Sequence, residues 1–214
     1  MGLTRESAMG QNETAAQVLD DRIKALLAAG DASGAVTEAL RALGPDVLGF
    51  VSGVLGNDAD ADEVFAVVSE RLWRSLAAFE WRCSLRTWSH VIARHEIERF
   101  RRGARRHVHG RVRISELAEV IAAVEAQTRS EQRSARQLAI ARLRDELPPE
   151  DRALLVLRVD RELPWDEVAL AFSEDPDKSS EEEIKRESAR LRKRFELLKK
   201  RLAVRAREEG LLSE

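Results

Sequence analysis

The sequence predicts an all-α fold made of two small helical domains joined by a linker. Apolar residues recur every three or four positions through most of the chain, as at Phe65, Val68 and Leu72. Glycine (11 residues) and proline (5 residues) are sparse among 214 residues, which indicates few tight turns. No segment has the alternating pattern of a half-buried strand, so helices account for the whole expected fold.

The chain before residue 56 is expected to form three helices. Residues 1–13 are expected to be disordered. Helical spacing begins near residue 14 and stops at Gly30, because glycine commonly ends a helix. Two further helices are expected at 34–43 and 45–55. They are separated at Gly44-Pro45, since proline suits the first turn of a helix.

The middle of the chain predicts two long helices with a short loop between them. The first covers 58–79, with one buried apolar stripe and an acidic first turn that complements the helix dipole. The loop 80–84 breaks this pattern, and the second helix is expected over 85–105. Residues 108–136 mix short apolar groups with charges, which is typical of a partly helical linker.

The C-terminal part predicts two short helices, a loop and one long basic helix. Helical spacing resumes over 138–147, Pro149 begins a short helix, and another short helix covers 165–172. Ser180 and Glu183 form a capping box that opens a final helix over 181–208. This order is typical of a helix-turn-helix. A basic coiled-coil surface would have the same apolar spacing, so a helical protein partner is the alternative.

Charge is strongly segregated although the net charge is only −2. Residues 99–113 contain seven arginines and no carboxylate, and residues 184–207 contain eleven lysines or arginines and two glutamates. Two cationic segments in an otherwise acidic chain indicate a polyanion held at two places. Ordinary solvated helix faces are the alternative.

The helix expected at 85–105 has a basic side, and aromatic rings precede it. The basic side would follow a phosphate backbone. Rings beside arginine are suited to stacking with unpaired bases, which favours a melted strand over an intact duplex. Core packing is the alternative for the rings, above all for Trp88. The candidate contacts are Phe79, Trp81, Arg82, Arg86, His90, Arg94, Arg101 and Arg105.

The final helix would enter the major groove of DNA by its N-terminal part. The cations nearest the bases would then be Lys185, Arg186 and Arg190. The cations that hold phosphates would be Arg192, Lys193 and Arg194.

Four stretches of the sequence resemble the bacterial sigma-70 family, specifically the small extracytoplasmic-function (ECF) sigma factors with only domains two and four. They are DADEVFAVVSERLW (60–73), SLRTWSHVIARH (84–95), LPPEDRALLVLRV (147–159) and LPWDEVALAF (163–172). The resemblance covers about 36–107 and 137–205. It implies an N-terminal extension (1–35), domain two (36–107), a linker (108–136) and domain four (137–207).

The resemblance implies a promoter-recognition subunit that binds core RNA polymerase and directs transcription initiation at −10 and −35 promoter elements. Domain two would recognise and melt the −10 element, with the loop 79–83 capturing a flipped base. Domain four would read the −35 element in the major groove. The resemblance places the core polymerase contact on the helix that contains Asp60, Asp62, Glu63, Glu70, Arg71 and Trp73. An anti-sigma factor as a further partner is left open.

The chain departs from the family pattern at several positions. Ala66 and Val67 stand where the family usually has glutamine and glutamate, and His95 stands where it has asparagine. Pro164 replaces the usual serine cap of a helix, and the loop 173–183 is longer than the usual turn. These departures affect the polymerase contact and the register of the last helix.

Several other classes of function are not predicted. No Gly-rich phosphate loop or nucleophile elbow is present, and the histidines lack the spacing of a metal site, so we expect no enzyme, no metal and no cofactor. No apolar run approaches the roughly 18 to 20 residues that span a bilayer. The single Cys83 excludes an intrachain disulfide and favours the cytoplasm. A helical adaptor and a stand-alone helix-turn-helix regulator are the alternative functions.

Overall fold

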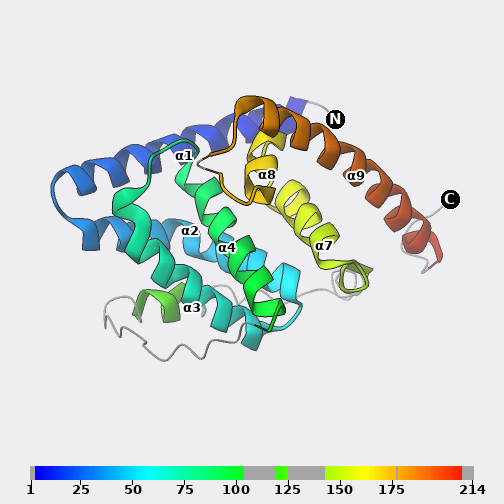
Figure 1. Ribbon diagram of the computed structural model, residues 1–214, viewed down its shortest axis with the longest axis horizontal. Helices are drawn as coiled ribbons and strands as arrows, with labels where there is room; N and C mark the ends of the chain where they lie inside the picture. The colour runs from blue at the N-terminus through cyan, green and yellow to red at the C-terminus, as the bar shows by residue number, and fades with distance from the viewer. Residues whose placement is uncertain (1–2, 104–118, 125–142, 177, 209–214) are drawn as a thin grey trace.

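The computed structural model describes residues 3–103, 119–124, 143–176 and 178–208, and within these ranges every regular element is helical (Figure 1). The prediction of an all-α fold is therefore confirmed. The longer stretches of α-helix are α1 (Leu3–Ala28), α2 (Ala32–Leu55), α3 (Asp58–Ser75), α4 (Leu85–Arg101), α7 (Pro149–Leu155), α8 (Trp165–Phe172) and α9 (Glu181–Glu208), and residues 119–124 and 143–145 are also helical. A 3-10 turn, η1 (Leu76–Ala78), follows α3, and a π-helical turn, η2 (Val156–Asp160), follows α7.

Helices α2, α3 and α4 pack around an apolar core, with α1 against α2 and α4 (Figure 1). Phe50 of α2 and Phe65 of α3 are fully buried in this core. Asn57 begins α3 by accepting hydrogen bonds from the backbone N–H groups of Ala59 and Asp60, at 2.9 and 3.3 Å. The apolar stripe predicted for this helix is buried from Phe65 to Phe79, so that prediction is confirmed.

Three predicted helix boundaries differ from the structure. Helix α1 begins at Leu3, whereas residues 1–13 were expected to be disordered. Helix α2 runs through Pro45 without a break, because burial of Leu43 and Val47 on either side offsets the roughly 3 kcal/mol cost of an interior proline. Helix α4 ends at Arg101 rather than near 105, and Gly103 then adopts a φ of +71° that few other residues tolerate.

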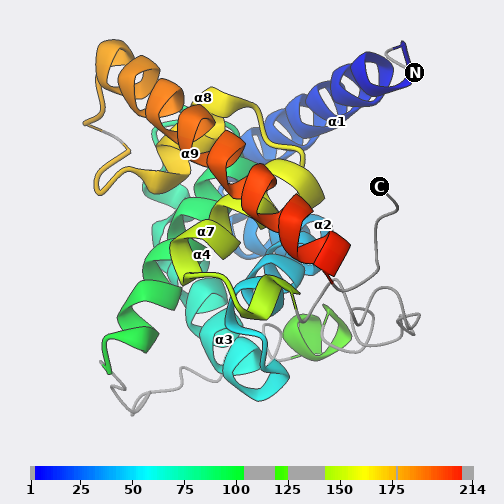
Figure 2. The same cartoon turned by 90° about the vertical axis from the view of Figure 1, so that its right-hand side faces the viewer.

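The C-terminal helices pack directly on the N-terminal ones. Helix α8 lies against α4, and α7 with η2 lies against α2. One continuous set of buried apolar side chains connects both groups, from Phe65 to Leu157 and Leu198. Figure 2 shows α9 crossing α8 and α7, while the N-terminal end of α1 extends away from the other helices. The predicted division into an extension, two domains and a linker stays a prediction, because most of 108–136 lies outside the described residues.

Helix α9 follows the expected capping box. The Ser180 N–H donates to Glu183 Oε2 at 2.8 Å, and the Glu183 N–H donates back to Ser180 Oγ at 3.3 Å. Leu191, Phe195 and Leu198 are buried against α7 and α8, as their spacing predicts. The opposite face of α9 is left to its many cationic side chains.

Candidate nucleic-acid interface

The loop before α4 has a fixed shape because both of its ends are anchored. Ser84 caps α4 by accepting the Thr87 N–H at 3.1 Å. Phe79 stacks on Trp88 with ring centroids 4.4 Å apart and an angle of 19° between the planes. Both rings are buried, with exposed fractions of 7% and 9%. Phe79 therefore supports its neighbours from inside the core in this conformation, and core packing of Trp88 is confirmed.

Of the three candidate residues in this loop, Trp81 and Arg82 reach the surface, whereas Phe79 is buried. Trp81 is partly exposed and has a φ of +60°, which is uncommon for a bulky residue. Its ring lies 4.9 Å from that of Phe79, and Lys24 Nζ of α1 lies 4.6 Å from its ring centroid. Arg82 is exposed and forms an ion pair with Glu80 at 2.9 Å.

The cationic side chains at the start of α4 do not face solvent. The Nε of Arg86 donates to Asp46 of α2 at 2.9 Å, and its Nη2 donates to the carbonyl oxygen of Arg161 at 2.8 Å. His90 is completely buried, with Nδ1 2.8 Å from the carbonyl oxygen of Arg86 and its ring edge-on to Phe50. Burial lowers the pKa of His90 to about 4, so its imidazole is neutral near pH 7.

Arg94 is held by the C-terminal end of α8. Its Nε donates to the carbonyl oxygen of Ala171 at 2.5 Å, and its Nη2 donates to that of Phe172 at 2.9 Å. His95 Nε2 lies 3.0 Å from the carbonyl oxygen of Ser173. The last carbonyls of a helix lack intrahelical donors and sit at the negative end of its dipole, so a guanidinium is a suitable partner. Helix α8 thus occupies the face of α4 on which nucleic-acid contacts were predicted.

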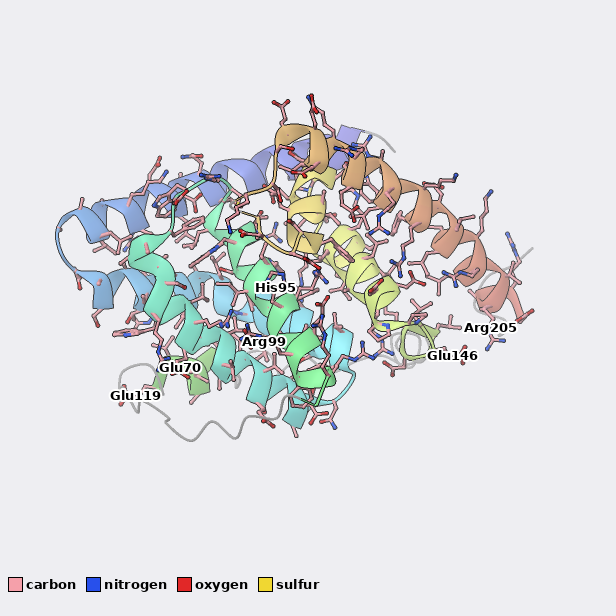
Figure 3. All side chains as sticks on the ribbon, in the orientation of Figure 1. Glu70, His95, Arg99, Glu119, Glu146 and Arg205 are labelled. Atoms are coloured by element: carbon pink, nitrogen blue, oxygen red, sulfur yellow. The ribbon has the colours of Figure 1, made fainter. Side chains whose placement is uncertain are left out.

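The last turn of α4 remains accessible. Arg101 and Arg102 are exposed, and Arg102 pairs with Glu98 at 3.2 Å. Figure 3 shows Arg99 one turn beyond His95 on α4; its Nη1 lies 3.6 Å from Glu96. Arg105 lies outside the described residues. Of the α4 candidates, the structure therefore exposes Arg101 and covers the three earlier ones.

The cations of α9 are largely on the surface. Arg190 pairs with Glu187 through two hydrogen bonds of 2.8 and 2.6 Å. Arg194 differs, because it turns back to α7 and bonds Asp151 and Glu150 at 2.6 and 2.7 Å. At the far end of the helix, Arg205 pairs with Glu146 at 2.8 Å (Figure 3). The candidates that are exposed are Lys185, Arg186, Arg190, Arg192 and Lys193.

The candidates for polymerase contact lie along α3. Glu63 is exposed, whereas Asp60, Asp62 and Glu70 are partly buried. Two others are engaged within the fold: Arg71 pairs with the buried Glu96 of α4 at 2.8 Å, and Trp73 packs against the core. Glu63 is therefore the most accessible member of this set.

Sequence reasoning did not identify the residues that join α2 to the C-terminal helices. Asp46 accepts hydrogen bonds from both Arg86 and Arg161, each at 2.9 Å. Arg152 donates to the carbonyl oxygen of Val54 at 3.0 Å. A Cβ added at Gly49 would lie 2.2 Å from Arg161 Nη2, so the missing side chain permits this approach. Glycine inside a helix costs about 1 kcal/mol relative to alanine. A glycine at this position of a predicted helix therefore could have indicated a close approach by another side chain.

Among the histidine, cysteine, aspartate and glutamate residues in the described part of the chain, no group of three or more is placed to hold a metal ion. Among the helices of the same part, none has the length and apolar character of a membrane span.

Comparison with protein families identifies part of the chain that carries these candidates. Residues 39–107 match the family described as Sigma-70 region 2. The matched segment contains most of α2, all of α3 and α4, and the loop with Trp81. Comparisons with curated proteins and with solved structures gave no match.

Proposed function

We propose that the chain is a member of the sigma-70 family, an ECF-type sigma factor that directs RNA polymerase to −10 and −35 promoter elements, because residues 39–107 match the family described as Sigma-70 region 2. The family supports a role in polymerase binding and promoter recognition, and it is not a family of enzymes. The observation that carries the proposal is that the matched segment folds as one unit, with α3, the Trp81 loop and α4 fixed against each other.

The −10 element would be recognised by the loop and by α4. An unpaired base would stack on Trp81, with Arg82 beside it to neutralise the backbone. The partial exposure of Trp81 and the exposure of Arg82 support this assignment. Phe79 would not contact the base itself. Its buried ring packs against the Trp81 ring and supports it. The acidic start of α3 would contact core RNA polymerase.

The −35 element would be read by the C-terminal helices. Helix α8, the loop 173–180 and α9 have the order of a helix-turn-helix, with α9 as the recognition helix. Exposed cations over the first half of α9, among them Lys185 and Arg190, support contact with DNA in the major groove. Arg194 is the exception, because α7 carboxylates already neutralise it.

Contact of the whole α4 face with DNA requires a change in the arrangement of the helices. Arg86 and Arg94 are covered by the C-terminal helices, so these helices would move away from α4 when the protein joins polymerase at a promoter. The boundary is crossed by many polar contacts, including a hydrogen bond from Thr87 to Glu167. Buried apolar side chains also connect the two groups of helices, so such a movement would expose part of that shared core to solvent.

Run-off transcription with purified core RNA polymerase tests the proposal. We expect specific initiation only when the chain and core are both present, with promoter binding that depends on core. A helical adaptor would show no dependence on DNA, and a stand-alone regulator would give a specific footprint without polymerase. Either result would contradict the proposal. The same experiment performed on templates with altered −10 and −35 sequences would test the two assignments separately.

A further inference from the structure

Helix α1 lies outside the segment that matches region 2, yet it contacts the loop and the start of α4. Asp20, Ile23 and Lys24 have the spacing of three and four residues that places them on one face of the helix. Ile23 is fully buried and Asp20 is 6% exposed. This face of α1 is therefore part of the folded unit that carries Trp81.

Asp20 fixes α1 relative to α4. Its carboxylate accepts the backbone N–H of Leu85, the first residue of α4, at 3.1 Å from Oδ1 and 3.4 Å from Oδ2. A carboxylate at this position satisfies a donor that has no intrahelical partner and complements the positive end of the helix dipole. Burial raises the pKa of Asp20, and the hydrogen bond from Leu85 opposes that effect. The turn of α1 that contains Asp20 is thus held against the start of α4, where the Trp81 loop ends.

Lys24, one turn after Asp20, projects over the Trp81 ring. Its Nζ lies 4.6 Å from the ring centroid and 3.7 Å from Asp21 Oδ1. The Lys24 side chain is 43% exposed, so its ammonium is at the surface and is only weakly held by the exposed Asp21. The ring itself is braced from the core by Phe79. A cation that solvent can reach therefore lies beside the ring that is assigned to base stacking.

We propose that Lys24 is a phosphate contact of the single-strand site, so that α1 supplies part of the surface that holds the melted strand. This inference rests on the proposed function, because it takes Trp81 as the ring on which a base stacks. Stacking of a base on an aromatic ring is worth about 1–3 kcal/mol, whereas an exposed cation–ring contact is worth about 0.5–1 kcal/mol. A base would accordingly take the ring surface, and the flexible lysine would move to a phosphate next to that base.

The test is the salt dependence of binding to a forked template whose −10 strand is unpaired. Polymerase assembled with the full chain is titrated with a fluorescent template over a series of KCl concentrations. Each neutralised phosphate of a single strand contributes about −0.7 to the slope of log K against log salt. Loss of the charge in Lys24→Gln should reduce the magnitude of the slope by about 0.7, and Lys24→Arg should restore it.

Arg22→Gln is the matched control. Arg22 lies on the same helix and carries the same charge, but it pairs with Glu38 at 2.8 Å and its side chain is 67% exposed. Its removal should leave the slope unchanged. An equal decrease for Arg22→Gln and Lys24→Gln would show a general effect of charge and would overturn the inference. Both side chains are largely at the surface, so unfolding temperatures should match that of the unchanged protein.

Trp81→Ala separates this inference from the proposed function on which it rests. If Trp81→Ala weakens binding to the forked template and Lys24→Gln leaves the slope unchanged, only the inference about Lys24 is wrong. If Trp81→Ala leaves binding unchanged, the stacking site itself is wrong and the inference fails with it. A reduced slope for Lys24→Gln together with weakened binding for Trp81→Ala supports both.

Discussion

Arg94 of α4 donates its Nε hydrogen to the carbonyl oxygen of Ala171 in α8 at 2.5 Å. The two residues are 77 positions apart, so this bond joins the region 2 segment to the C-terminal helices. The guanidinium is nearly buried and also lies over the Phe172 ring, with Cζ 4.7 Å from the centroid. Glu98 of α4 pairs with this guanidinium, and α8 supplies two further acceptors, so loss of the α8 contacts would leave part of its hydrogen-bonding capacity unsatisfied.

We expect Arg94→Ala to loosen α8 from α4. Hydrogen bonds to charged groups contribute about 1.5–3 kcal/mol each, and removal of the guanidinium leaves two carbonyl oxygens without this donor. The free energy of unfolding should fall by about 2 kcal/mol, and amide hydrogen exchange should accelerate over 165–172. Arg102→Ala, on the exposed end of α4, should change stability by no more than about 0.5 kcal/mol. Unchanged protection of α8 in Arg94→Ala would contradict the prediction.

Stability should fall as the pH decreases from 7 to 5 because His90 must stay neutral in the fold. Burial lowers its folded pKa from 6.5 to about 4, although Asp46 opposes the shift. Only the unfolded chain binds a proton between these values, so the stability is complete above pH 6.5 and is lost as the pH falls toward 4. Between pH 7 and pH 5 this amounts to about 2 kcal/mol. Urea unfolding at the two pH values measures it.

His90→Gln is the variant that isolates this contribution. Glutamine does not titrate, so the pH-dependent loss should shrink by about 2 kcal/mol relative to the unchanged protein. His95 also has a lowered pKa through burial, and His95→Gln reports its separate share. Burial opposes the ionisation of Asp46, but His90 and two arginines lower its pKa, and both arginines remain in His90→Gln. An equal pH dependence in His90→Gln and the unchanged protein would refute the assignment.

The absence of a side chain at Gly49 should be required for Arg161 to reach Asp46. Alanine is favoured over glycine inside a helix by about 1 kcal/mol, but its Cβ at this position would lie 2.2 Å from Arg161 Nη2. Gly49→Ala should therefore bring no gain in stability by itself. In an Arg161→Ala background, where the obstacle is gone, the same change should stabilise the protein by about 1 kcal/mol. A similar gain in both backgrounds, measured by urea unfolding, would show that Arg161 moves aside without cost.

Helices with one strongly periodic apolar face could be predicted from the sequence. The stripe from Phe65 to Phe79 and the capping box of Ser180 and Glu183 depend on local spacing alone, and both are confirmed. The continuity of α2 through Pro45 could not be predicted, because it depends on what packs on either side of the proline. Local rules describe an isolated segment, whereas burial against other helices decides whether an unfavourable residue is tolerated.

The candidate interface was predictable as a set of residues but not as a surface. A helical wheel places Arg86 and Arg94 on one side of α4, but it does not show that α8 and the segment around Arg161 lie on that side. Asp46 was missed for the same reason, since its partners are 40 and 115 residues away. The sequence predicted that these arginines contact DNA. In the structure, Arg86 and Arg94 instead bind a carboxylate and backbone carbonyl groups of the same chain.

Recognition of the −35 element by α9 predicts a loss of base preference in Arg190→Ala. Arg190 is exposed and is oriented by two hydrogen bonds to Glu187, one turn nearer the start of the helix. A direct arginine contact to a base pair is worth about 1–3 kcal/mol of discrimination, so the ratio of transcription between the preferred and an altered −35 sequence should fall by about tenfold. Lys199→Ala, more than two turns further along, removes the same charge and should lower transcription from both templates alike. If Arg190→Ala also leaves the ratio unchanged, α9 holds only phosphates or does not enter the groove.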